Sequence, residues 1–258
     1  MALSRLSRSV KGSVVIVTGA ASGMGRATAH VFADQGARLA LVDLNVEALQ
    51  DVVNEVNAAG GNARGWSLDL SERSAIAPVV NDIAEHFGGV DVLVNNAGIS
   101  IPAPLESDAY EEAWDKSIAV LLTAQVTMIK AALPYLRQAD SPRIINIAST
   151  EALGATKFGS PYTAAKSGVV GLTRSMALEL GSDGITVNCV CPGPIHTGMT
   201  AGIPDEQKEI FARRRTALKR YADPEEVAHA TLSLALPAAQ YITGVTLPVD
   251  GGLTIRNA

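Results

Sequence analysis

The stretch Val14-Val15-Ile16-Val17-Thr18-Gly19-Ala20-Ala21-Ser22-Gly23-Met24-Gly25 joins a run of apolar residues to a glycine-rich turn. Four apolar residues in succession, Val14 to Val17, are typical of a strand that is buried on both faces of a sheet. A helical pattern covers Gly23–Gln35, so the order is strand, turn, helix. This order predicts the first unit of an α/β fold with a parallel sheet.

The same alternation continues along the chain. The other predicted strands are Arg38–Val42, Val90–Val94, Arg143–Ala148, Ile185–Val190 and Gly244–Val249. The other predicted helices are Leu44–Ala59, Arg73–Phe87, Tyr110–Leu136 and Tyr162–Leu180. Strands that alternate with helices predict a doubly wound, Rossmann-type parallel sheet with helices on both faces. No linker or internal repeat interrupts the pattern, so residues 1–258 are expected to form a single domain, with a frayed terminus over 1–11.

The composition excludes several classes of protein. Hydrophobic residues make up 47% of the 258 residues and charged residues 18%, which is far from the composition of disordered chains. A net charge of −5 argues against binding to nucleic acid or to an anionic membrane. No uncharged apolar run reaches the roughly 18 residues that a spanning helix needs, so a soluble, cytoplasmic protein is expected.

Cysteines and histidines give little sign of covalent or metal chemistry. Cys189 and Cys191 lie two apart in a predicted strand, so they share one face and cannot easily bridge. The four histidines are scattered without the spacing of metal ligands. We therefore expect neither a disulfide nor a metal site.

The segment Ile118–Ile129 is apolar nearly all round. A helix without a polar face needs a cover on two sides. The second cover is expected to be a partner subunit, and a central position inside one subunit is the alternative.

The glycine turn has the features of a pyrophosphate site. Glycines let backbone N–H groups approach the ligand at the positive end of the following helix. Asp43 ends the second strand, 18 residues beyond Gly25, close to the spacing of a carboxylate that binds an adenosine ribose. Ser22 and Leu44 carry no charge that could bind a 2′-phosphate, so the pattern favours NAD. The alternative role for Asp43 is to cap the next helix.

Tyr162 and Lys166 are four residues apart, so they project from the same face of a helix. A neighbouring ammonium group is expected to lower the pKa of the tyrosine toward the range that is useful for proton transfer. Alone, this pattern is weak.

Other motifs strengthen it: Asn95-Asn96-Ala97-Gly98, Ser149 thirteen residues before Tyr162, Pro192-Gly193 followed by Thr197, and Val249-Asp250-Gly251-Gly252. Together they resemble the short-chain dehydrogenase/reductase family over Val14 to Gly252. The resemblance implies that Ser149 holds the substrate oxygen, Tyr162 is the acid/base, and Lys166 binds the nicotinamide ribose. It also implies a homotetramer, with a dimer as the alternative.

The resemblance further implies a cofactor-binding set. Its members are Gly19, Ser22, Gly23, Met24, Gly25, Asp43, Leu44, Asp69, Leu70, Asn96, Ala97, Gly98, Tyr162, Lys166, Pro192, Gly193, Ile195 and Thr197. The implied activity is NAD(H)-dependent interconversion of a secondary alcohol and a ketone. The alternatives are a 3-oxoacyl thioester reductase and a catalytically weak NAD-binding regulatory protein.

One position departs from the family pattern. The family places an asparagine on the helix after the fourth strand, where it holds a water that links the lysine to solvent, and Leu121 stands there in this chain. Backbone carbonyls, Ser117 or Gln125 are the possible substitutes.

The substrate region is the least defined part of the sequence. Glu151 either meets a polar substrate group or is a solvated loop acid. Phe158, Met199 and Ile203 are candidates for an apolar wall. The basic cluster Arg213-Arg214-Arg215, with Lys219 and Arg220, has two interpretations. It binds a carboxylate, phosphate or acyl-carrier partner, or it belongs to a solvated helix or to salt bridges between subunits, and the second interpretation is favoured.

Overall fold

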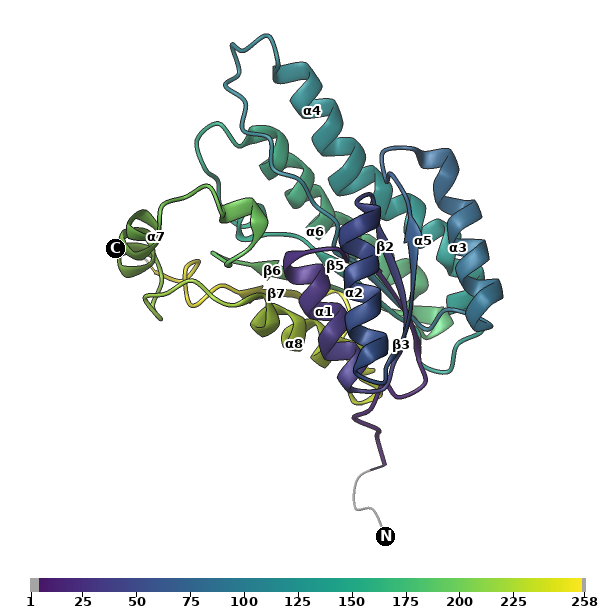
Figure 1. Ribbon diagram of the computed structural model, residues 1–258. Helices are drawn as coiled ribbons and strands as arrows, with labels where there is room; N and C mark the ends of the chain where they lie inside the picture. Colours follow the sequence, from purple (N-terminus) through teal and green to yellow (C-terminus); the bar gives the residue numbers. More distant parts are fainter. Residues whose placement is uncertain (1–4, 257–258) are drawn as a thin grey trace.

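Seven parallel strands form one sheet in the computed structural model, which describes residues 5–256 (Figure 1). The order across the sheet is β3-β2-β1-β4-β5-β6-β7. The strands are β1 (Val14–Thr18), β2 (Arg38–Asp43), β3 (Asn62–Ser67), β4 (Val92–Asn95), β5 (Arg143–Ile147), β6 (Thr186–Pro192) and β7 (Thr246–Val249). This sheet confirms the predicted doubly wound, Rossmann-type α/β fold.

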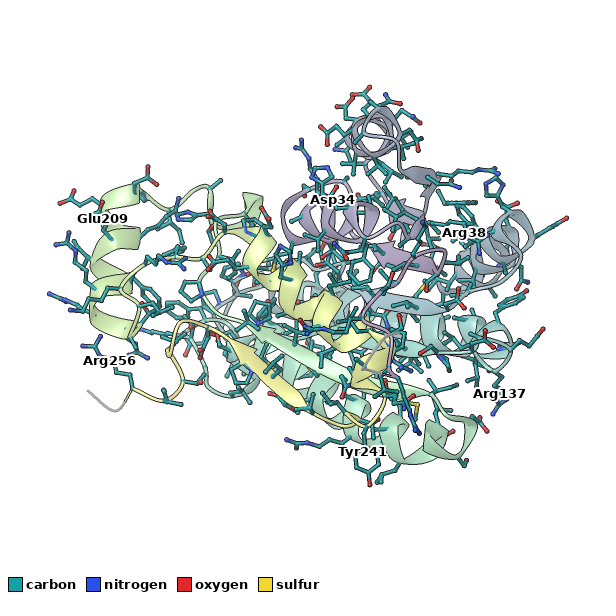
Figure 2. All side chains as sticks on the ribbon, turned by 90° about the horizontal axis from the view of Figure 1, so that it is seen from below. Asp34, Arg38, Arg137, Glu209, Tyr241 and Arg256 are labelled. Carbon is teal, nitrogen blue, oxygen red and sulfur yellow. The ribbon has the colours of Figure 1, made fainter. Side chains whose placement is uncertain are left out.

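Helices cover both faces of the sheet (Figure 1). One face carries α1 (Gly23–Asp34), α2 (Val46–Ala58) and α8 (Pro224–Ala235). The other face carries α3 (Arg73–Phe87), α5 (Ala124–Leu136) and α6 (Ser160–Leu180). Two further helices, α4 (Tyr110–Ile118) and α7 (Asp205–Arg215), extend beyond these layers. Side chains drawn in Figure 2 place α7, with Glu209 labelled, far from Arg137 at the other end of the molecule.

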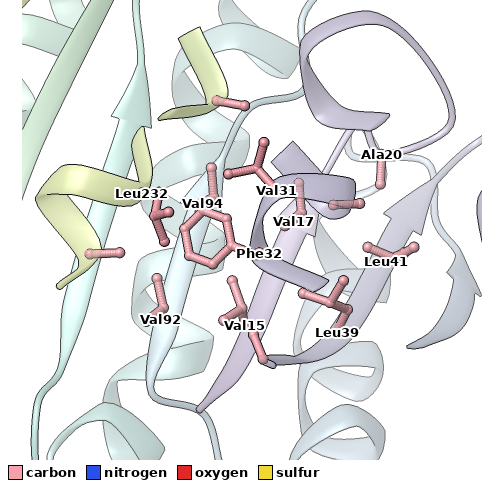
Figure 3. Packing of buried hydrophobic residues seen from close by; sticks show 14 of the residues in the cluster. Val15, Val17, Ala20, Val31, Phe32, Leu39, Leu41, Val92, Val94 and Leu232 are labelled. Carbon is pink, nitrogen blue, oxygen red and sulfur yellow. The ribbon is translucent and has the colours of Figure 1, made fainter. Parts of the chain in front are cut away.

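The core explains why β1 is apolar at every position. Val15 and Val17 face α1 and α8, where they surround the fully buried ring of Phe32 (Figure 3). Val14 and Ile16 face the opposite layer of α3 and α5. Each such side chain contributes about 1.5–3 kcal/mol when it leaves water. Both faces of the central strand are therefore part of the core.

The strand β3 is not predicted by the sequence patterns. In β3, only Ala63 and Trp66 are buried, and the residues between them are polar or glycine. The strand lies at the edge of the sheet, where one side of its ladder is unpaired. An edge strand needs little apolar surface, so the signal for it is weak.

The amino-terminal segment differs from the expected frayed end. Its first four residues lie outside the described part of the chain. The carbonyl of Ser7 accepts a hydrogen bond from the backbone N–H of Ala238 at 2.9 Å, and Val10 is buried in the core. A single apolar side chain is enough to dock this polar stretch.

The predicted long apolar helix has two differently covered sides. Tyr110–Leu136 is long and apolar enough by composition to cross a membrane, and its most apolar window has a mean hydropathy of 1.5 and is 39% buried. Leu121 and Met128 are buried against the rest of the subunit. Trp114 and Val126 are 38% and 41% exposed. The second side is thus open in one copy of the chain.

Candidate active site

Ser149, Tyr162 and Lys166 meet beyond the carboxyl end of β5. Ser149 follows β5 and caps a short helical turn, Thr150–Ala152. Its hydroxyl accepts a hydrogen bond from the backbone N–H of Glu151 at 3.1 Å. Tyr162 and Lys166 occupy successive turns of α6, which starts with Ser160 and Pro161. The Ser149 hydroxyl lies near enough to the Tyr162 phenol to favour its ionised form. The structure therefore brings the three predicted residues together.

Lys166 is held deep in the protein. Its Nζ donates a hydrogen bond to the carbonyl of Ile147 at 2.7 Å and lies 5.7 Å from the centre of the Tyr162 ring. The side chain is 2% exposed, and burial lowers its pKa to about 8. An ammonium group in this position has little freedom, so it can orient what binds beside it.

The phenol of Tyr162 behaves differently from the sequence expectation. Its pKa is raised, because burial disfavours the tyrosinate more than the neighbouring Ser149 hydroxyl favours it. The negative charge of Glu151 raises it further. The prediction that Lys166 lowers the pKa of Tyr162 is therefore wrong for the described residues by themselves.

Two thiols that the sequence analysis did not connect with the site face Lys166. Cys189 and Cys191 are free, buried, and packed beside Val169 and Val170 of α6. The Sγ of Cys189 donates to the carbonyl of Val190 at 3.7 Å. The two neighbouring thiols shift each other's pKa, which is lowered for Cys191 and raised for Cys189. Their alternate spacing on β6 was the signal that they share the α6 face.

The glycine turn is shaped by close backbone contacts. A Cβ on Gly25 would lie 1.9 Å from the carbonyl oxygen of Gly19, and Gly19 and Gly23 have φ angles of +67° and +52°. Ser22 begins α1 without capping it through its side chain. The first-turn N–H groups of α1 thus remain available for an anion such as a pyrophosphate. These residues fit a dinucleotide cofactor.

Asn96 supports this turn with its side chain. Its buried Nδ2 donates to the carbonyls of Thr18 and Gly19 at 2.8 and 3.2 Å. Thr18, which the sequence analysis overlooked, accepts the backbone N–H groups of Asn96 and Ala97 through its hydroxyl, both at 3.0 Å. Gly98 is exposed beyond them. The motif therefore clamps the turn from the neighbouring strand.

Asp43 sits at the end of β2, beside the glycine turn. Its Oδ2 accepts the N–H of Ala21 at 3.0 Å, and its Oδ1 accepts the N–H of Asn45 at 2.9 Å. Asn45, whose side chain accepts the N–H of Ala48, caps α2, so the alternative role of Asp43 as the helix cap is wrong. Leu44 and Ser22 are exposed. No ion pair in residues 5–256 neutralises the Asp43 carboxylate.

The remaining cofactor candidates lie in different surroundings. Asp69 accepts the N–H and hydroxyl of Ser71 at 2.8 and 2.7 Å, which lowers its pKa, and Leu70 is half-buried beside it. Ile195 is only 4% exposed, and its side chain packs in the core. Thr197 does reach the turn, since its Cγ2 would lie 3.3 Å from a Cβ on Gly23.

Pro192 ends β6 beside the last strand, and Gly193 follows it. A Cβ on Gly193 would lie 2.7 Å from the Cα of Asp250. This close approach lets the chain leave the sheet toward Thr197. The pair therefore sets where the following segment passes.

The helix keeps a kink at the position where the family asparagine is replaced. Residues Ala119–Thr123 form a π-turn, in which the N–H of Ala124 bonds to the carbonyl of Ala119. Leu121 is fully buried. The Ser117 hydroxyl and both amide atoms of Gln125 are also buried, and they have no hydrogen-bond partner in the described part of the chain. These groups, with the carbonyls that a π-turn leaves unpaired, are the ones able to hold a water there.

We expect Leu121→Asn to raise kcat and to lower the solvent isotope effect on it, because the amide would restore a proton path to Lys166. Steady-state rates in H2O and D2O measure this. Leu121→Met keeps the volume without adding a polar group and is the matched control. An unchanged kcat and isotope effect in Leu121→Asn would show that the existing groups already carry the proton.

A cavity of about 480 Å3 opens in front of Ser149 and Tyr162. Met199 and Ile203 line it as predicted, and Phe158 does not. The other apolar members of the wall, which the sequence analysis missed, are Ile101, Phe211 and Leu253. They come from segments far apart in the chain, so no local pattern could reveal them.

The basic cluster belongs to an exposed helix end. Arg213 lies 3.5 Å from Glu209, four residues earlier on α7, and both side chains are about 70% exposed. None of the three arginines lines the cavity in front of Tyr162. This arrangement favours the solvated-helix interpretation.

Relatives of known activity match nearly the whole sequence of this chain. A family model described as enoyl-(acyl carrier protein) reductase matches residues 19–254. The 3-oxoacyl-[acyl-carrier-protein] reductase of Thermotoga maritima is 37% identical over 95% of this chain and 99% of its own length. The meso-2,3-butanediol dehydrogenase of Serratia marcescens is 39% identical over 93% of this chain and 94% of its own. The chain belongs to the short-chain dehydrogenase/reductase family.

Solved structures of short-chain dehydrogenases/reductases have the same fold as this chain. L-Sorbose reductase from Gluconobacter frateurii, solved with NADPH and L-sorbose, aligns with a TM-score of 0.91 at 28% identity, covering 96% of this chain and 99% of that one. The family resemblance seen in the motifs is thereby confirmed, and with it an oxidoreductase that uses a nicotinamide cofactor.

Proposed function

We propose that this chain is an NAD(H)-dependent oxidoreductase that interconverts a secondary alcohol and a ketone. The observation that carries the proposal is that Ser149 and Tyr162 line a cavity, with Lys166 buried beside them, at the same edge of the sheet as a glycine turn that fits a dinucleotide. The replacement of the family asparagine by Leu121 is the argument for a catalytically weak regulatory protein. Such a protein would not need Ser149, Tyr162 and Lys166 to lie together.

The residues act on the substrate oxygen. The Ser149 hydroxyl donates a hydrogen bond to it, and the Tyr162 hydroxyl delivers a proton to it in reduction or removes one in oxidation. Lys166, fixed by the Ile147 carbonyl, orients the groups beside Tyr162. The nicotinamide cofactor, when bound at the glycine turn, supplies or accepts the hydride.

Asp43 supports a preference for NAD over NADP. Its carboxylate is not neutralised by a cation in residues 5–256, and a 2′-phosphate would be repelled by it. The same oxygens can accept hydrogen bonds from the two ribose hydroxyls of NAD. Leu44 and Ser22 offer no compensating charge.

Asp43→Ser is therefore expected to lower kcat/KM for NAD⁺ by about 10- to 100-fold and to raise it for NADP⁺. Rates with each cofactor at a fixed alcohol concentration give the ratio. Asp51→Ser, which removes an exposed carboxylate from α2, is the matched control and should leave the ratio alone. A wild-type preference for NADP⁺ would contradict the role given to Asp43.

A 3-oxoacyl thioester reductase is the second candidate, because one such enzyme is 37% identical over nearly the whole chain. The two are separated by assaying purified protein with NAD⁺ and NADP⁺ against chiral secondary alcohols and a 3-hydroxyacyl thioester. Oxidation of alcohols with NAD⁺ supports the first candidate. Activity confined to the thioester supports the second, and tight NADH binding without any turnover supports a regulatory role.

We also propose a homotetramer, or else a dimer, in the cytoplasm, with no nucleic-acid or membrane partner. Support for self-association comes from the open side of Tyr110–Leu136, where Trp114 and Val126 are exposed. A second copy could cover this side.

A further inference from the structure

Glu151 is a carboxylate held at the edge of the cavity and directed by two hydroxyl groups. Its Oε1 accepts the hydroxyl of Thr156 at 2.7 Å, and its Oε2 accepts the hydroxyl of Thr163 at 3.3 Å. Its backbone N–H is bound to Ser149. The side chain is half-buried and lines the same cavity as Ser149 and Tyr162. Two hydroxyl groups thus hold the carboxylate, whereas a loop acid that is simply solvated would lack such partners.

The charge of Glu151 is not balanced locally. No lysine, arginine or histidine within residues 5–256 forms an ion pair with it. Lys157 also lines the cavity, but its ammonium group lies over the ring of Phe158, 4.6 Å from the centre. The carboxylate is close enough to the reacting group to raise the pKa of Tyr162. The unpaired carboxylate of Glu151 beside the site of proton transfer therefore restricts which polar groups a substrate can place next to it.

Carboxylate oxygens only accept hydrogen bonds, and each has two lone pairs. The threonines occupy one acceptor position on each oxygen of Glu151, so others remain for a donor on the substrate. A substrate that brought a carbonyl or a carboxylate to this place would meet acceptor against acceptor or charge against charge. A hydroxyl group, in contrast, would gain a charge-assisted hydrogen bond.

We propose that Glu151 selects substrates that carry a second hydroxyl group next to the reacting carbinol, namely vicinal diols and polyols. This inference rests on the proposed function, because it assigns the substrate of the same site. The reacting oxygen lies between Ser149 and Tyr162, and the second hydroxyl donates to Glu151. The rest of a neutral substrate contacts the apolar side chains of Met199, Ile203 and Phe211. The acceptor-only carboxylate also disfavours 3-oxoacyl thioesters, whose second polar group is a carbonyl.

The test compares butane-2,3-diol with butan-2-ol, which share a carbon skeleton and differ by one hydroxyl group. Hydrogen bonds to a charged group are worth enough for a preference of about 10- to 100-fold, so wild-type kcat/KM should favour the diol by that factor. Glu151→Leu should bring the ratio of the two substrates near one, and Glu151→Gln, whose amide oxygen still accepts, should keep part of it. Glu179→Leu, at the far end of α6, is the control and should keep the wild-type ratio.

Two further substrates separate hydrogen bonding from charge. 1-Aminopropan-2-ol places an ammonium group where the diol has a hydroxyl, and ethyl 3-hydroxybutyrate places an ester carbonyl near it. The ester is expected to be the poorest substrate of wild type and to improve relative to the diol in Glu151→Leu. An amino alcohol that outperforms the diol would overturn the assignment in favour of cationic substrates.

The outcomes distinguish this inference from the proposed function. Equal use of diol and butan-2-ol by wild type, or a ratio that is unchanged in Glu151→Leu, overturns the role of Glu151 and leaves the oxidoreductase standing. Turnover of none of the alcohols overturns both. Circular dichroism spectra and thermal melts of each variant exclude misfolding as the cause of a changed ratio.

Discussion

Tyr162→Phe is expected to reduce kcat for alcohol oxidation by about 10²- to 10⁴-fold, the usual contribution of a positioned acid or base. The phenol oxygen is the only part removed, and the Ser149 hydroxyl keeps the bond that it accepts from the Glu151 N–H. The bond from Lys166 to Ile147 does not involve the phenol and should persist. NADH affinity, measured by fluorescence titration, should therefore change little while turnover disappears.

Tyr135→Phe is the matched control for this prediction. Its hydroxyl donates to Asn81 at 2.9 Å on the surface between α3 and α5, away from the cavity. Both turnover and cofactor binding should match wild type. If Tyr162→Phe retained more than a tenth of the wild-type kcat, another group would be carrying the proton.

Gly25→Ala is expected to weaken NADH binding by about 100-fold or more, a loss comparable with that caused by a 1 Å misplacement in a binding site. The added methyl group would stand 1.9 Å from the carbonyl oxygen of Gly19, so α1 or the turn must move. The Asn96 amide, which binds that same carbonyl, would be displaced as well. Fluorescence titration gives the affinity, and a thermal melt gives the accompanying loss of stability.

Gly171→Ala provides the comparison, because a Cβ there meets no atom within 4 Å. It lies in the interior of α6, where alanine is a better helix former than glycine, so stability should stay equal or rise by up to about 1 kcal/mol. Normal NADH affinity in Gly25→Ala would mean that the turn does not hold the pyrophosphate.

The sequence predicts the fold well where burial is two-sided. Apolar runs such as Val14 to Val17 exist because both faces of β1 are covered, and this pattern cannot be mistaken for an exposed segment. At the edge of the sheet, β3 needs only two buried side chains, and its polar neighbours hide it. Val10 is a similar case, since one apolar contact in a polar segment leaves no periodicity.

For the candidate site, motifs predict which residues gather but not how each is used. Asn96 and Ile195 illustrate the difference: one gives its amide to the glycine turn, and the other is buried in the core. Both uses depend on contacts between strands that are distant in sequence. The cavity-wall residues Ile101, Phe211 and Leu253 could not be predicted for the same reason. The spacing of the cysteines predicts that they share one face, but not that Lys166 lies beside them.

The pairing of β1 has a consequence for the making of the protein. One edge of β1 bonds to β2, which follows closely, but the other edge bonds to β4, and the contact between Val14 and Asp91 spans 77 residues. At ribosomal speeds of roughly 5–20 residues per second, that second edge stays unpaired for on the order of 4–15 s. During this interval an apolar strand with a free hydrogen-bonding edge is exposed to other nascent chains. The emergence of Val92–Asn95 is the event that closes this period of vulnerability to aggregation.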